Sequence, residues 1–153
     1  MKHAAPIRIL GIGSSLGDDE VGWLVATKLL QNLDPDKIVV SMHDRPGANL
    51  VRLMQGAEIV VLIDGVKRGF SPGTLCRLEG KEIHLAYKNL TSTHGFGVAE
   101  ALQLAEKLGD VPSRIVLWGM EIESVDPDSG LSDAVRDAIP ALVKAIQEEV
   151  NAL

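Results

Sequence analysis

The chain has 153 residues, a formal net charge of -6 at pH 7 and a sequence pI of about 5.1. This length suits one domain, spanning residues 1–153, that buries its core without disulfides or a structural metal. The acidic balance and the lack of a Lys/Arg run exclude a nucleic-acid groove. The chain has a single cysteine, Cys76, which cannot form an internal disulfide. It shows no signal-peptide pattern and no segment of membrane-spanning length. We therefore expect a cytoplasmic protein without a membrane partner, and we expect it to be a monomer.

Short apolar runs alternate with amphipathic segments along the chain, which is typical of βα units around a parallel sheet. In chain order, strands are expected at residues 7–12, 37–43, 57–64, 74–79 and 114–119. Helices are expected at residues 19–31, 48–55, 94–108 and 132–150.

The strand at 57–64 contains five consecutive apolar residues, which indicates burial on both faces at the centre of the sheet. The strand at 74–79 is mixed in character and follows a turn, which favours an antiparallel edge. Right-handed crossovers place the first strand between the second and the third. The predicted fold is therefore α/β, a three-layer sandwich whose five-stranded, mostly parallel, twisted sheet has one antiparallel edge strand.

A glycine-rich turn follows the first strand and leads into three consecutive acids. Its glycines are Gly11, Gly13 and Gly17, and the acids are Asp18, Asp19 and Glu20. A glycine turn before a helix usually binds phosphate, because free N–H groups and a partial positive charge lie there. Three carboxylates would repel a phosphate, so the turn favours a site for a cation or for proton transfer.

Ligands of open α/β sheets bind beyond the carboxyl ends of the strands. Asp19 follows the first strand, Asp64 ends the third, and His94 precedes a later helix, so we expect these three side chains to converge. Two carboxylates and one imidazole are an established ligand set for a divalent ion, and they leave positions open for water or substrate. No Ser/His/Asp or Cys/His pair is recognisable, which favours direct attack by water over an acyl-enzyme.

Simpler roles are open for several of these residues. Asp18 and Glu20 are expected to cap or stabilise the helix start, Asp64 could form a turn before Gly65, and His94 could begin a helix. Ser14 and Ser15 fit turn positions, and Cys76 fits a structural thiol.

A dinucleotide-binding module is an alternative for the whole chain. Gly11, Gly13 and Gly17 follow a strand, and Asp44 ends the second strand, where a ribose-binding acid would lie. The acidic helix start argues against this alternative, since it repels pyrophosphate.

An ordered set of short motifs resembles the nickel–iron hydrogenase maturation endopeptidases. The motifs, in chain order, are Gly11-Ile12-Gly13, Gly17-Asp18-Asp19, Val21-Gly22, Val61-Leu62-Ile63-Asp64, Pro72-Gly73-Thr74-Leu75, Ser92-Thr93-His94, Gly119-Met120-Glu121 and Gly130-Leu131-Ser132. The resemblance extends over nearly the whole chain. Ser14 departs from it, because the family usually has asparagine there.

The resemblance implies a hydrolase, a metal-dependent endopeptidase. It would remove a C-terminal extension from the hydrogenase large-subunit precursor after nickel insertion, and the precursor would carry the nickel. Asp19, Asp64 and His94 would recognise this nickel, and zinc or cadmium could substitute for it. Glu20 would take the role of Asp19 if the helix began one residue later. A protein that binds nickel or the precursor without cleaving it is the remaining alternative.

Overall fold

The computed structural model describes residues 7–88, 93–109 and 111–153, and the side chains of residues 88 and 93–97 are also outside this description. Its strands are β1 (Ile7–Gly13), β2 (Ile38–Asp44), β3 (Ile59–Val66), β4 (Leu75–Glu79) and β5 (Arg114–Glu121). Its α-helices are α1 (Val21–Asn32), α2 (Leu50–Met54), α3 (Lys81–Lys88), α4 (Thr93–Leu108) and α5 (Asp133–Asn151). Two 3-10 helices, η1 (Gly17–Glu20) and η2 (Gly47–Asn49), precede α1 and α2.

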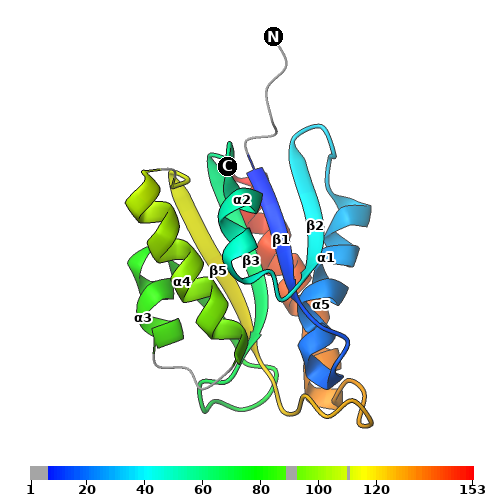
Figure 1. Cartoon of the computed structure of the whole chain (residues 1–153). Coiled ribbons are helices and arrows are strands. Elements are labelled where there is room, and N and C mark those ends of the chain that lie inside the picture. Colours follow the sequence, from blue (N-terminus) through cyan, green and yellow to red (C-terminus); the bar gives the residue numbers. More distant parts are fainter. Residues whose placement is uncertain (1–6, 89–92, 110) are drawn as a thin grey trace.

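The strands form one sheet in the order β2-β1-β3-β5-β4 (Figure 1). β1 pairs in parallel with β2 and β3, β3 pairs in parallel with β5, and β4 pairs antiparallel with β5. The structure therefore confirms both the predicted position of the first strand between the second and the third and the antiparallel edge strand.

Helices cover both faces of this sheet. Alternate side chains of the central strands belong to two separate cores, as Ile63 and Leu62 of β3 illustrate. The core around Ile63 contains residues of α1 and α5, and the core around Leu62 contains residues of α2, α3 and α4. A strand that is covered on both faces needs a continuous apolar run, which explains the sequence of β3.

The structure corrects several predicted boundaries. The helix expected at 19–31 begins as η1, and α1 starts only at Val21. β3 continues beyond the predicted end at residue 64 to Val66, so Asp64 lies inside the strand rather than at its end. The helix α3 was not predicted. It is separated from β4 by Gly80 alone, and its residues Ile83 and Tyr87, which lie four residues apart, are buried in the core.

No helix in the described part of the chain is long and apolar enough to cross a membrane.

Asp18 joins η1 to the distant segment that leads into α5. Its Oδ2 accepts hydrogen bonds from the backbone N–H groups of Glu123 and Ser124, at 2.8 and 3.2 Å, and from Ser132 Oγ at 2.8 Å. Its Oδ1 accepts from the N–H of Ser132 at 2.7 Å. Neither η1 nor α1 has a side-chain cap, so Asp18 and Glu20 do not cap the helix. Both acids lie in the first turn of η1, where stabilisation of the helix start by their charge stays a prediction.

These hydrogen bonds also set the acidity of Asp18. Burial acts to raise the pKa of the carboxyl, but the donors of Ser132, Glu123 and Ser124 favour the charged form and together lower the pKa below its ordinary value of 3.8. A carboxyl whose pKa is lower in the folded state stabilises the fold above its unfolded-state pKa. This stabilisation is lost as the pH falls through the folded-state pKa.

We predict that Asp18→Asn lowers the free energy of unfolding at pH 7 by about 2 to 3 kcal/mol, because an amide NH₂ would face donors that now meet a charged oxygen. Chemical denaturation measures the change, and the difference from wild type should shrink below about pH 4 as Asp18 becomes protonated. Asp133→Asn is the matched control. The Asp133 side chain is 87% exposed, so its substitution should change stability by about 0.5 kcal/mol or less. An equal effect of both variants would contradict the assigned role of Asp18.

Candidate active site

The turn after β1 folds back on the end of its own strand. A Cβ on Gly13 would lie 2.3 Å from the backbone oxygen of Asp19, closer than any side chain tolerates, so glycine is required there. The N–H of Ser14 donates to that same oxygen at 3.3 Å, and the N–H of Asp18 donates to Ser124 O at 2.8 Å. The N–H of Leu16 donates to Ser14 Oγ. These N–H groups already have partners within the protein, which argues against a phosphate-binding turn.

Asp19 is the buried acid of the turn that faces the end of β1. Its side chain is 1% exposed, and Ser14 Oγ donates a hydrogen bond to its Oδ2 at 2.5 Å. Glu20, which could replace Asp19 in the metal site, is only partly buried. The geometry therefore gives Asp19, rather than Glu20, a fixed and enclosed carboxylate.

Asp64 lies near the carboxyl end of β3 and is fully buried. The hydroxyl of Tyr87, on α3, donates to its Oδ2 at 2.9 Å. β1 and β3 pair in register up to Gly11 and Ile63, and one further step places Ile12 beside Asp64. Ser14, whose hydroxyl donates to Asp19, follows the last residue of β1. The segments that carry Asp19 and Asp64 therefore lie at the same edge of the sheet.

The third predicted residue, His94, belongs to α4. Its side chain is outside the described residues, so its convergence with Asp19 and Asp64 stays a prediction. Among the side chains that the structure describes, no three His, Cys, Asp or Glu residues form a group that could hold a metal ion.

Sequence reasoning did not assign a role to Glu121, the last residue of β5. Its carboxylate is buried and accepts hydrogen bonds from the backbone N–H groups of Arg68 and Gly69, at 2.9 to 3.2 Å. Glu121 therefore fixes the segment that follows β3, two residues beyond the end of the strand that carries Asp64. The sequence signals were its position at the end of a buried strand and its place in the motif Gly119-Met120-Glu121.

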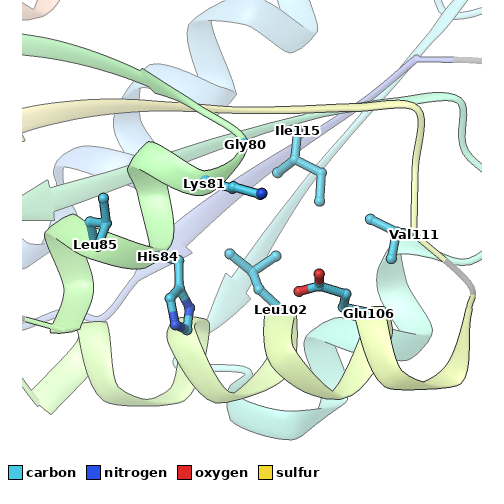
Figure 2. Close-up of a pocket in the computed structure, with 8 residues that line it drawn as sticks. All are labelled: Gly80, Lys81, His84, Leu85, Leu102, Glu106, Val111 and Ile115. Carbon is cyan, nitrogen blue, oxygen red and sulfur yellow. The ribbon is translucent and has the colours of Figure 1, made fainter.

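A cavity of about 580 Å³ lies away from these acids, between α3, α4 and the start of β5 (Figure 2). Gly80, Leu102 and Ile115 are among the residues that line it. Ile115 pairs with Val60, four residues before Asp64 along β3. The cavity is thus near the amino end of β3, whereas ligands of such sheets bind at the carboxyl ends.

The described geometry defines an α/β protein with two enclosed carboxylates at the carboxyl edge of its parallel sheet. The chain belongs to the hydrogenase maturation protease family, whose model matches residues 25–149. The matched range includes Asp64 and His94 and begins after the acid turn. Family membership confirms the resemblance predicted from the sequence and makes the chain an endopeptidase, so neither the dinucleotide-binding module nor the non-catalytic alternative is supported.

Individual relatives agree with this assignment. The hydrogenase expression/formation protein HupD of Thiocapsa roseopersicina is 33% identical, over 96% of this chain and 69% of its own length. The hydrogenase 2 maturation protease of Escherichia coli is 29% identical, over 92% of this chain and 88% of its own. The solved structure of the hydrogenase maturating endopeptidase HybD from E. coli matches with a TM-score of 0.88 at 25% identity, over 95% of this chain and 92% of that one.

We predict that Gly13→Ala disrupts the turn, because its methyl group would overlap the Asp19 carbonyl and displace η1. Such overpacking costs about 1 to 3 kcal/mol of unfolding free energy, measurable by urea denaturation. Ser15→Ala, at the exposed neighbouring position, should be close to neutral. If Gly13→Ala were as stable as Ser15→Ala, the close packing of η1 on β1 would be contradicted.

Proposed function

We propose that this endopeptidase removes the C-terminal extension of a hydrogenase large-subunit precursor after nickel has been inserted. Asp19, Asp64 and His94 would complete the coordination of the nickel that the precursor carries. The observation that carries the proposal is the placement of Asp19 and Asp64, two buried acids from different elements, at one edge of the sheet. Both acids thus lie at the edge of a parallel sheet where ligands of such folds bind.

The donor types fit this substrate. Carboxylate oxygens and an imidazole nitrogen are both ligands of divalent first-row metals, and imidazole suits nickel. Three protein ligands leave positions for the precursor's own ligands and for water. Cleavage would then depend on nickel loading, because the nickel-free precursor would lack the group that these residues recognise.

The reaction is hydrolysis of one peptide bond. We propose that water attacks the scissile carbonyl directly, adding its oxygen to the carbon while its proton is transferred to the leaving amine. A divalent ion beside the carbonyl can polarise it or lower the pKa of a bound water. Asp19 and Asp64 would hold that ion in register with the scissile bond, which makes their orientation important to the rate.

The burial of Asp19 and Asp64 limits the access of a metal ion to their carboxylates. Asp19 is 1% exposed and Asp64 is 0% exposed, so a substrate-borne metal cannot touch them while their surroundings keep this arrangement. The surroundings of the two carboxylates must therefore open when a metal ion binds.

We predict that Asp64→Asn and Asp19→Asn each reduce processing of nickel-loaded precursor by at least about 100-fold, because each removes a charged ligand. His94→Ala should have a similar effect. Shortening of the large subunit on a denaturing gel measures processing. Asp36→Asn, at an exposed turn position, is the matched control and should process at the wild-type rate.

Two further measurements of precursor processing test the choice of Asp19 over Glu20 and the recognition of nickel. Glu20→Gln should keep most of the activity, since Asp19 is the enclosed acid of the turn; a severe loss would transfer the role to Glu20. Nickel-free precursor should stay uncleaved. Equal cleavage of nickel-free and nickel-loaded precursor would refute recognition of the metal, even though the chain would still be an endopeptidase.

A further inference from the structure

Each of the two candidate metal-binding acids accepts a hydrogen bond from a buried hydroxyl group of another segment of the chain. Ser14 Oγ donates to Asp19 Oδ2 at 2.5 Å, and Tyr87 Oη donates to Asp64 Oδ2 at 2.9 Å. Ser14 and Tyr87 are 2% and 4% exposed. A hydroxyl that donates to one carboxylate oxygen restricts rotation of the carboxylate about its terminal torsion, which is otherwise broad.

Tyr87 is held from two sides. Along α3 it follows Ile83 by four residues, so both side chains pack into the same core, where Leu62 and Leu117 also lie. Its hydroxyl reaches the sheet at Asp64. Burial raises the pKa of the phenol, and the Asp64 charge, its hydrogen bond and Cys76 raise it further. Tyr87 therefore stays protonated and remains a donor at neutral pH.

The strand register places Asp64 in one row with a glycine and a cysteine. Asp64 pairs with Gly119 of β5, and Gly119 pairs with Cys76 of β4, so the three residues form one row across the sheet. A Cβ on Gly119 would lie 2.8 Å from Cys76 Sγ and 3.2 Å from a methyl group of Val66. The absence of a side chain at Gly119 leaves this space to the thiol.

We propose that Ser14 and Tyr87 are positioning residues, whose hydroxyls orient the carboxylates of Asp19 and Asp64 for the metal that the precursor carries. This inference rests on the proposed function and assigns no contact with substrate to either hydroxyl. Partners of metal ligands fix the orientation of those ligands, and their removal typically costs about 10- to 100-fold in metal affinity or activity.

The first test compares Tyr87→Phe and Ser14→Ala with wild type, using cadmium as the probe. Both variants remove one oxygen and keep the rest of the side chain. Each should weaken cadmium binding in titration calorimetry, and slow single-turnover processing of nickel-loaded precursor, by about 10- to 100-fold. Ser15→Ala, an exposed serine beside Ser14, is the matched control and should leave both quantities unchanged. Wild-type affinity and rate in Tyr87→Phe and Ser14→Ala would overturn the proposal.

The second test separates positioning from general loss of stability and uses intact protein. The chain contains one tyrosine, so labelling tyrosine with ¹³C at Cζ gives a single resonance that reports on the Tyr87 hydroxyl. Cadmium should shift this resonance in wild type and in the Ser15→Ala control, because coordination by Asp64 changes the charge that the hydroxyl meets. In Asp64→Asn the shift should be absent.

The outcomes distinguish this inference from the proposed function. Cadmium binding that depends on Asp19 and Asp64 but leaves the Tyr87 resonance unmoved would overturn the positioning role and leave the metal site intact. Processing that survives Asp64→Asn would instead refute the proposed function.

Discussion

The buried carboxylate of Asp18 holds the acid turn in place, and the geometry of the site depends on it. Its two oxygens accept hydrogen bonds from residues 105 to 114 positions away in the chain. The turn after β1 is thereby fixed to the segment between β5 and α5. Glu121 acts similarly on the segment after β3. Two acids that do not belong to the proposed ligand set thus organise the two segments next to Asp19 and Asp64.

Neighbouring acids in one turn have different roles because of the local backbone. Asp18 and Asp19 lie in a 3-10 helix, in which successive side chains point about 120° apart. Asp18 therefore faces Ser132 and the segment before α5, while Asp19 faces Ser14 at the end of β1. An α-helix that began at residue 19, as the sequence pattern predicted, would have directed these side chains differently.

The order of the strands could be predicted from the sequence. Apolar periodicity is a local property of the sequence, and the right-handed crossover is a general rule of parallel sheets. The run Ile59 to Ile63 identified the central strand, and the mixed residues of β4 identified the antiparallel edge. The helix α3 was missed because it is short, follows β4 with hardly any connection, and has polar residues on most of its surface.

The candidate site could be predicted only in part. Asp19 and Asp64 could be assigned to the carboxyl edge of the sheet because the first follows a strand and the second was expected to end one, and ligands of open sheets bind at that edge. The roles of Asp18 and Glu121 depend on backbone donors from distant segments, which no local pattern encodes. The contact between Tyr87 and Asp64 depends likewise on α3 packing against the sheet, and that packing is set by the tertiary structure.

The central claim is that Asp19, Asp64 and His94 bind one metal ion together. Anomalous diffraction from crystals of the protein soaked with cadmium tests this claim most directly, because it locates the ion without reference to activity. The account predicts a single strong anomalous peak within coordination distance of all three side chains. A peak coordinated by Glu20 in place of Asp19, or one that lies in the cavity between α3 and α4, would contradict it.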